Sequence, residues 1–297
     1  MTQSKKQPAS LLLWLLAIVL TLVLAVFQRT SGPTYPIRGQ EKSNGFVISY
    51  RLLRSHIAMS PLPVTVIARP SSPAASAKSL SAWLNYRRYR GDQEWTSIVM
   101  SKTVTGEQPA RITFNASIPG QPAAGKVEYK ITINTASGDR LLHQGRPAIA
   151  RFRGPVPAPL LIAHIMFMFL GMLLALRTGL EALRRRGGRY DRLVSWTLAV
   201  TLIGGFLLGP LVQKCAFGAF WTGFPLGTDL TDNKILLAVI FWLAAFFLNK
   251  RSRWWVVAAA VLMVVVYLIP HSLLGSELDY RTGKMTNTYS GIERSID

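Results

Sequence analysis

The chain has 297 residues, 49% of them hydrophobic, and its 34 Lys plus Arg against 14 Asp plus Glu give a formal net charge of +20. The apolar residues are concentrated in long runs, which excludes an ordinary soluble globular protein and predicts a membrane protein. The single cysteine, Cys215, excludes an internal disulfide, and c-type haem attachment is excluded because no Cys-x-x-Cys-His sequence occurs. No P-loop, dinucleotide fingerprint, zinc-ligand spacing or Ser-His-Asp order is present, so the sequence indicates no catalytic residues.

The first apolar run covers residues 11–27, LLLWLLAIVLTLVLAVF, and contains no charged residue. As a helix it would be about 26 Å long at 1.5 Å per residue, close to the thickness of a bilayer's hydrocarbon core. Lys5 and Lys6 precede the run, and no small-x-small cleavage pattern follows it. We therefore expect an uncleaved transmembrane signal anchor after a short N-terminus of residues 1–10.

The polar segment that follows, residues 28–154, consists of short stretches in which apolar and polar residues alternate. These stretches are GFVISYRLL, LPVTVIA, LSAWLNYRRY, EWTSIVM, ARITFNASI, KVEYKITINT, RLLHQ and AIARFR. Turn sequences such as VTGEQ and SGD separate them. Seven or eight short strands at this spacing predict an all-β sandwich.

Two parts of this segment, LNYRRYRGDQEWTSIVM and then IPGQPAAGKVEYKITI, carry a resemblance to a known family. They resemble the immunoglobulin-like, fibronectin type III-like modules of many bacterial extracytoplasmic proteins. The resemblance covers about residues 36–153. It implies a binding or spacer module and brings no catalytic residues to this chain.

The predicted sandwich is strongly basic. Between residues 28 and 155 there are 18 Lys plus Arg and 6 Asp plus Glu. Such a surface suits two partners, the anionic head groups of a lipid bilayer or an acidic protein that docks on it. Nucleic acid is not expected as a partner, because the domain is predicted outside the cytoplasm and its strands lack a clear aromatic and basic platform.

Four further apolar runs, residues 160–176, 193–212, 235–248 and 254–269, predict a four-helix transmembrane bundle over residues 155–270. The third of these runs is short for a span. It becomes long enough if its helix begins upstream, within the sequence WTGFPLGTDLTDNK. Together with the signal anchor, the bundle gives five predicted transmembrane helices.

Small residues mark the expected contacts between these helices. Gly171 and Ala175 are four positions apart in one run, and Gly205 and Gly209 are four apart in the next. Small side chains at this spacing allow helix backbones to approach closely in lipid. Pro210, which follows directly, is expected to kink or loosen its helix.

Lys and Arg residues beside the spans predict the orientation, because positive charge near a membrane is retained in the cytoplasm. Three basic clusters fall on one side only if the N-terminus is cytoplasmic. Residues 28–154 and the C-terminal tail, 271–297, are then outside the cytoplasm. The spans are expected in the cytoplasmic (inner) membrane of a bacterium. The clusters contain Lys5, Lys6, Arg177, Arg184, Arg185, Arg186, Arg189, Arg192, Lys250, Arg251 and Arg253.

This orientation places several polar residues at the outer membrane face. Asp229 and Thr231 are good caps for the start of a helix, and Asp232 would lie in its first turn. His164 lies about one turn below the outer end of the second span, and His271 follows the helix-ending Pro270. The predicted polar cluster consists of His164, Asp229, Asp232, Asn233, Lys234, His271, Glu277, Asp279 and Tyr280.

Three interpretations of this cluster remain open. In the first, His164 and His271 are the axial ligands of a haem b. In the second, the histidines and carboxylates hold a metal ion or a quinol head group. In the third, the residues are interfacial polar groups that hydrogen-bond to the loop, the tail and the domain above, since isolated polar groups are costly in lipid.

The chain resembles uncharacterised bacterial multi-span membrane proteins. The resemblance rests on one span before the polar segment and four after it, and on the sequences FWTGFPLGTDLTDNK and PHSLLGSELDY. It implies no activity. We therefore expect a non-catalytic structural or scaffold subunit of a bacterial membrane complex, with an external docking domain and protein partners. The alternative is an electron-transfer subunit that binds haem b or quinol through His164 and His271.

Overall fold

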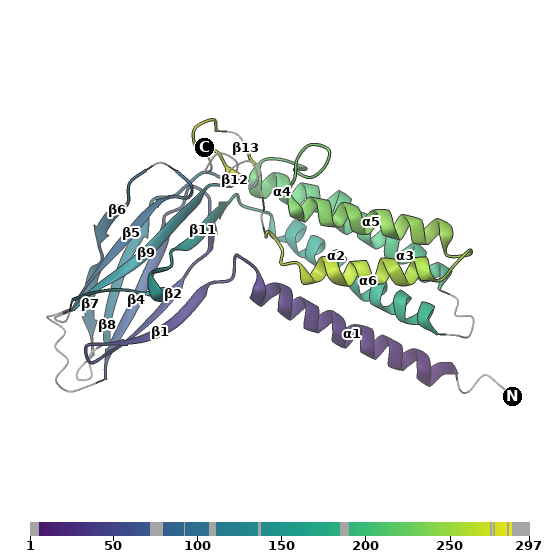
Figure 1. The fold of residues 1–297 in the computed structure, drawn as a ribbon, viewed down its shortest axis with the longest axis horizontal. Coiled ribbons are helices and arrows are strands. Elements are labelled where there is room, and N and C mark those ends of the chain that lie inside the picture. Colours follow the sequence, from purple (N-terminus) through teal and green to yellow (C-terminus); the bar gives the residue numbers. More distant parts are fainter. Residues whose placement is uncertain are drawn as a thin grey trace. The chain divides into compact units, whose positions relative to one another are not determined.

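The computed structural model describes residues 6–71, 80–91, 93–106, 111–135, 138–184, 190–273, 275, 277–283 and 285–286. The chain forms two compact units (Figure 1). Met1–Pro33 and Val156–Gly275 form a helical unit, and Thr34–Pro155 and Ser276–Thr286 form a β unit. The fold therefore combines apolar helices with antiparallel and mixed β-sheets.

Four helical segments are long and apolar enough to cross a membrane, Ser10–Ser31, Ala158–Leu183, Asp191–Phe217 and Leu230–Leu248. A fifth apolar helix, Trp254–Leu268, is shorter. The elements of the helical unit are α1 (Lys6–Ser31), α2 (Ala158–Leu183), α3 (Asp191–Leu202), the π-helical η3 (Ile203–Leu208), α4 (Gly209–Phe217), α5 (Leu230–Leu248) and α6 (Trp254–Leu268).

Helix α5 begins inside the polar stretch, as the sequence predicted. Asp229 is its N-cap, and the Asp229 carboxylate accepts a hydrogen bond of 2.7 Å from the backbone N–H of Thr231. A capping carboxylate satisfies one of the N–H groups that a helix start leaves unpaired. The cap lets the helix begin five residues before the apolar run and so reach 19 residues.

Small residues lie where the helices approach one another. A Cβ atom on Gly171 of α2 would lie 3.2 Å from Thr201 Oγ1 of α3, and one on Gly205 of η3 would lie 2.5 Å from Ile235 Cγ1 of α5. Ala175 is fully buried in the same helical core. Trp242 of α5 is also fully buried there, so the helical core contains both a bulky side chain and small ones.

The third predicted span contains a π-helical turn between α3 and α4. Its Gly209 donates a backbone N–H to the carbonyl of Gly204, five residues earlier. Pro210 lies one residue later and has no N–H to donate to Phe206, four residues before it. The missing donor accounts for the wider turn at this point, in agreement with the expected loosening.

Helix α2 continues past its apolar run and carries charge into the helical unit. Arg177 and Glu181 form an ion pair of 2.7 Å, with side-chain exposures of 5% and 11%. The Arg177 guanidinium also lies 5.3 Å from the centre of the Trp14 ring of α1. The buried arginine is thus paired with a carboxylate and lies close to an aromatic ring. Arg185, Arg186 and Arg189 lie outside the described residues.

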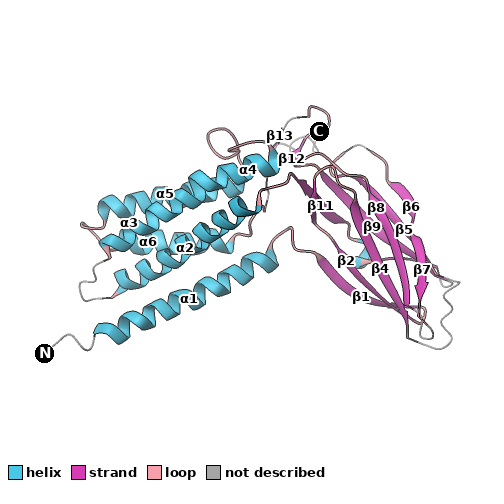
Figure 2. Ribbon diagram, turned by 180° about the vertical axis from the view of Figure 1, so that it is seen from behind, coloured by secondary structure: helices cyan, strands magenta, loops and turns pink. Residues whose placement is uncertain are grey.

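The β unit contains two main sheets (Figure 2). One has the strand order β1-β2-β4-β8-β7, here called sheet A, and the other has the order β3-β11-β9-β5-β6 with β10 beside β9, here called sheet B. The strands are β1 (Ile37–Ser43), β2 (Phe46–Leu52), β3 (Ser55–Ile57), β4 (Leu62–Pro70), β5 (Ser81–Arg88), β6 (Thr96–Val99), β7 (Ser101–Thr105), β8 (Arg111–Ile118), β9 (Lys126–Thr135), β10 (Gly138–Leu141), β11 (Ala148–Arg153), β12 (Glu277–Leu278) and β13 (Met285–Thr286).

One hydrophobic core lies between sheets A and B. Phe46 and Phe114 come from sheet A, Tyr129 and Phe152 come from sheet B, and each is at most 1% exposed. Burial alternates along β2 and β4, as expected for strands with one face on a core. The Tyr129 hydroxyl donates to the backbone carbonyl of Leu53 at 2.9 Å, so the buried phenol is satisfied.

Seven of the eight predicted strands are present, but RLLHQ overlaps β10 only at Arg140 and Leu141, because His143–Gly145 form a 3-10 turn. The structure adds β1, β3 and β7 to the sandwich. β1, IRGQEKS, and β7, SKTVT, contain few apolar residues, and both lie at the edge of sheet A. An edge strand need not bury a full apolar face, so its sequence lacks the alternation by which the other strands are recognised.

Candidate functional site

Asp232, a member of the predicted polar cluster, lies in the first turn of α5. Asp232 is 6% exposed, and its Oδ2 accepts hydrogen bonds from the Thr222 N–H at 2.6 Å, the Thr222 hydroxyl at 3.1 Å and the Gln213 amide at 3.1 Å. One buried carboxylate oxygen thus joins α4, the loop and α5. Its lone pairs are directed at structural partners.

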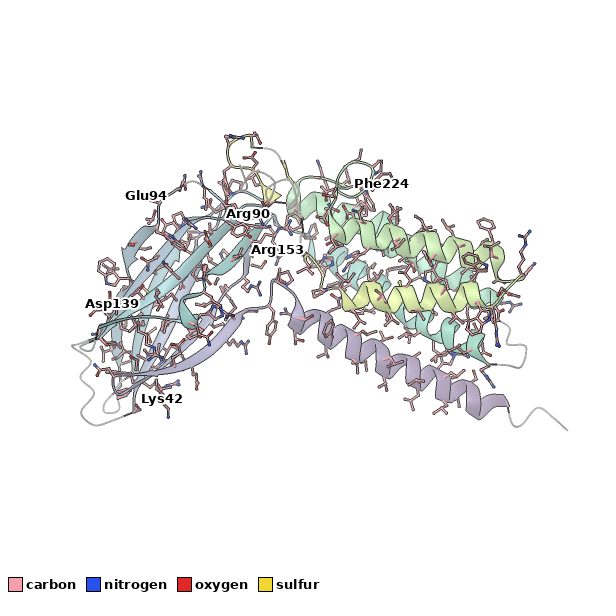
Figure 3. The ribbon with its side chains drawn as sticks, in the orientation of Figure 1. Lys42, Arg90, Glu94, Asp139, Arg153 and Phe224 are labelled. Carbon is pink, nitrogen blue, oxygen red and sulfur yellow. The ribbon has the colours of Figure 1, made fainter. Side chains whose placement is uncertain are left out.

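The neighbouring residue continues this arrangement. Asn233 Oδ1 accepts a hydrogen bond of 2.6 Å from the Phe224 N–H. Gly223 packs so closely that a Cβ atom there would lie 2.6 Å from Asp232 Cβ. The Phe224 side chain is 69% exposed at the tip of this loop (Figure 3). The loop is therefore fixed by its polar residues at the base and presents an aromatic residue at the tip.

Lys234 and Gln28 hold the end of α6. Lys234 Nζ donates to the Ile269 carbonyl at 2.9 Å. Gln28 of α1 donates its amide to the carbonyls of Tyr267 and Ile269, the latter at 3.0 Å, and its Oε1 accepts from the His271 N–H at 3.0 Å. These side chains satisfy carbonyl groups that the end of a helix leaves unpaired.

His164 contacts the π-helical turn. Its Nδ1 lies 3.0 Å from the Gly204 carbonyl oxygen, and a Cβ atom on Gly209 would lie 3.6 Å from His164 Cε1. Because a carbonyl can only accept, Nδ1 carries the proton in this bond and Nε2 remains as the basic nitrogen. The His271 side chain is exposed. The two histidines thus differ in burial and in their hydrogen-bonding partners.

Glu277 and Tyr280 contact strands of the β unit. Glu277 pairs with Lys126 Nζ at 2.8 Å and with Arg90 Nη1 at 3.4 Å. The Tyr280 hydroxyl donates to the Lys126 carbonyl at 3.1 Å, and the Arg88 guanidinium lies 4.5 Å from the centre of the Tyr280 ring. These contacts attach the tail to β5 and β9.

Burial and local hydrogen bonds shift the pKa values of three ionisable groups around this tail. Burial lowers the pKa of Lys126, and the hydrogen bond to Glu277 opposes that shift. Burial raises the pKa of Tyr280 to about 12. The backbone N–H of Arg281 donates to Asp279 and lowers the pKa of that carboxyl group. Asp279 thus forms a local turn through its contacts with Arg281 and Thr282.

The outer face of sheet B carries a group of aromatic and basic side chains, which corrects the expectation that the strands lack such a platform. Two cations lie close to the Trp95 ring, with the Arg87 guanidinium 4.7 Å and Lys130 Nζ 4.4 Å from its centre. Arg87 also pairs with Glu128 at 2.6 Å. Trp83, on the adjacent β5, is 40% exposed. The alternation of apolar and polar residues in β5 and β9 could have indicated that these residues share one face.

Among the described residues, no group of three or more His, Cys, Asp or Glu side chains is arranged to hold a metal ion. No protein-family model and no curated protein matches the chain. Among solved structures, the chain is similar to Astrotactin-2, a vertebrate-specific, perforin-like membrane protein involved in neuronal development, with 9% identity and a TM-score of 0.24. The match covers 81% of this chain and 37% of Astrotactin-2, and a score this low supports no argument about fold or function.

Proposed function

We propose that the chain is a non-catalytic scaffold subunit of a bacterial inner-membrane complex, with five spans, a cytoplasmic N-terminus and the β unit outside. The basic residues beside the spans support this orientation. The fifth span is α6, whose 15 residues extend about 22 Å at 1.5 Å per residue. A short span is accommodated by local thinning of the bilayer.

The β unit is, in this proposal, an immunoglobulin-like module. Its strand order supports the assignment, since β2-β4-β8-β7 faces β11-β9-β5-β6, matching the orders A-B-E-D and G-F-C-C′. β3 pairs in parallel with β11, as a short first-strand extension does in such sandwiches, and the other pairs in sheets A and B are antiparallel.

The observation that carries the docking role is the basic and aromatic face of sheet B. Trp95, with Arg87 and Lys130 close to its ring, and the exposed Trp83 on the same sheet combine apolar area with positive charge. Aromatic and arginine side chains are enriched where protein partners bind, and a positive face favours an acidic partner. The Asp232 and Asn233 oxygens, by contrast, accept hydrogen bonds that fix their own loop.

Site-specific photo-crosslinking tests this role in the native membrane. A benzoylphenylalanine at position 83 is expected to give a discrete adduct with an acidic protein, and the yield should fall as salt rises because screening weakens the encounter. The matched position is Thr65, exposed on sheet A. Equal adducts from both positions, or none from position 83, would refute docking on this face.

The orientation has its own test. Alkaline phosphatase, which is active only outside the cytoplasm, is fused after Asp297 and, separately, within the α5–α6 connection after Arg251. We expect activity from the first fusion and none from the second. The reverse pattern in stably inserted fusions would contradict the proposed topology.

The geometry at His164 favours one alternative function. A histidine that donates Nδ1–H to a backbone carbonyl presents Nε2 to a metal, as haem ligands do. His271 fits this role less well because its side chain is exposed. The absorbance spectrum of the purified protein decides the matter. A Soret band with sharp reduced bands, lost in His164→Ala, would establish the electron-transfer role and refute the scaffold role.

A further inference from the structure

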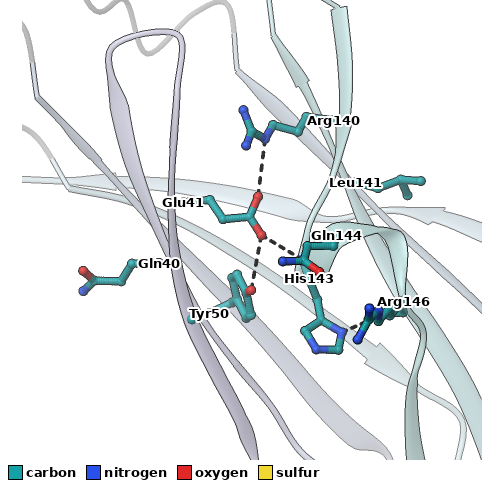
Figure 4. A pocket seen from close by; sticks show the side chains of 9 residues that line it. Gln40, Glu41, Tyr50, Arg140, Leu141, His143, Gln144 and Arg146 are labelled. Atoms are coloured by element: carbon teal, nitrogen blue, oxygen red, sulfur yellow. Dashed lines mark hydrogen bonds and ion pairs between the residues drawn. The ribbon is translucent and has the colours of Figure 1, made fainter.

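The β unit contains a hollow of about 540 Å³ between β1 and the turn that follows β10 (Figure 4). A volume of this size is typical of small-molecule sites. β1 belongs to sheet A and β10 to sheet B, so the hollow lies at an open side of the sandwich. It is lined by Gly39, Gln40, Glu41, Tyr50, Arg140, Leu141, His143, Gln144 and Arg146.

Glu41 lies at the centre of this hollow and its charge is already compensated. Its Oε1 accepts hydrogen bonds from the Tyr50 hydroxyl at 3.2 Å and from the His143 N–H at 2.8 Å, and its Oε2 pairs with Arg140 Nε at 3.3 Å. The Glu41 side chain is 16% exposed. Three donors on one carboxylate fix the wall of the hollow and leave little capacity to bind a cation.

Two features of the backbone allow Tyr50 and the His143 turn to reach Glu41. Gly39 pairs with Tyr50 across β1 and β2, and a Cβ atom at position 39 would overlap the Tyr50 ring. His143 and Gln144 both have φ of 55°, a left-handed conformation that non-glycine residues rarely adopt. The Glu41 contact holds the first of them, and strained turns of this kind cluster at binding sites.

The groups left available are donors. Arg140 uses Nε for Glu41 and is 50% exposed, so its terminal nitrogens face outward. Arg146 is exposed, and in the part of the chain that the structure describes its guanidinium makes no hydrogen bond or ion pair. Gln144 adds an amide group. The hollow therefore presents two guanidinium groups around a neutralised carboxylate.

We propose that this hollow binds a small ligand that carries two separated anionic groups, carboxylates or phosphates. Arg140 and Arg146 lie on different sides of Glu41, so a ligand that contacts both must be elongated (Figure 4). Guanidinium groups bind carboxylate and phosphate through paired hydrogen bonds. Glu41 positions Arg140 and the turn, and it excludes ligands that are cationic at this point.

Isothermal titration calorimetry on the full chain in detergent tests the proposal. The probes are adipate and tripolyphosphate, which carry separated charges, with acetate and inorganic phosphate as their single-group counterparts at matched ionic strength. At least one elongated probe should bind about tenfold more tightly than its counterpart, because a second charge-assisted contact is added. Adipate and tripolyphosphate distinguish a carboxylate ligand from a phosphate ligand.

Arg146→Gln should abolish that tenfold advantage. The matched control is Arg38→Gln, an exposed arginine of β1 that does not line the hollow, and we expect its affinity to stay within twofold of the wild type. The circular dichroism melt of each variant verifies folding. The proposal is overturned if the wild type binds neither elongated probe at millimolar concentration, or if Arg38→Gln weakens binding as much as Arg146→Gln does.

Discussion

The start of α5 and the hollow beside β1 each contain a carboxylate that accepts three hydrogen bonds, Asp232 and Glu41, and they differ in what surrounds it. Around Asp232 the donors are Thr222 and Gln213, and the neighbouring Asn233 is also bonded to the loop. Around Glu41 one donor is Arg140, whose outer nitrogens face solvent. The first arrangement is closed, and the second leaves charge for a ligand.

This difference follows from the two solvents. In lipid an unpaired polar group costs several kcal/mol, so polar residues at a helix end are satisfied by neighbouring loops and carbonyl groups. At a water-exposed sheet edge an arginine can remain half-exposed at little cost. A polar residue near a span is therefore a weak indication of a site, whereas an unsatisfied cation in a hollow is a stronger one.

The largest expected effect is at the closed arrangement. Asp232→Ala leaves the Thr222 N–H, the Thr222 hydroxyl and the Gln213 amide without their acceptor and should lower the free energy of unfolding by about 3 kcal/mol. Thermal melts in detergent measure it. Asp191→Ala, at an exposed position in the first turn of α3, is the matched control. Equal effects of the two substitutions would contradict the structural role of Asp232.

A somewhat smaller effect is expected where helices touch. Gly205→Ala places a Cβ atom 2.5 Å from Ile235 Cγ1 and should cost about 2 kcal/mol through overpacking. Ile235→Ala removes the atom that clashes, so the double variant should regain part of the stability relative to the sum of the single effects. Strict additivity in this double-mutant cycle would show that the two residues are not in contact.

The tail of the β unit supplies a pH-dependent effect. Burial raises the pKa of Tyr280 from 10.0 to about 12, so the folded state favours the neutral phenol. Its contribution is fully present below pH 10 and is lost as the pH rises through 12. The difference in melting temperature between the wild type and Tyr280→Phe should shrink over this window. A difference that stays constant from pH 9 to pH 12 would argue against the buried hydroxyl.

The smallest effect is expected at the open arrangement. Arg146→Gln should change the free energy of unfolding by no more than about 0.5 kcal/mol, because the exposed guanidinium stabilises nothing in the fold. Chemical or thermal unfolding of this variant beside Asp232→Ala measures the contrast directly. A loss above 1 kcal/mol at Arg146 would make it a structural residue.

Local sequence predicted much of the fold and less of the sites. The cap at Asp229 and the strands with alternating burial were predictable, because the relevant contacts are close in sequence or repeat with a fixed period. Glu41 was not, since its partners Arg140 and His143 lie 99 and 102 positions away. Only the pairing of sheet edges brings such residues together, and no local pattern records it.

The attachment of Glu277 to Lys126 was likewise outside the reach of the sequence. The position of Glu277 after the last span predicts that it joins the polar cluster of His164 and His271 at the outer membrane face. The structure pairs it with Lys126 and Arg90 on the β unit, 151 and 187 positions away. The composition of the segment shows that basic residues are abundant there, but it does not indicate which of them pair with Glu277.

The bonds from Gln28 to the end of α6 also constrain how the protein is made. The first helix leaves the ribosome more than 230 residues before Tyr267, Ile269 and His271, the groups that Gln28 holds. During that interval the Gln28 amide lacks these partners, so its bonds to the end of α6 form only after α6 has been synthesised. A chain that ends before Tyr267 cannot form these bonds, so the polar end of α1 keeps an unpaired Gln28 side chain. We expect such a chain to be degraded faster than the full-length protein.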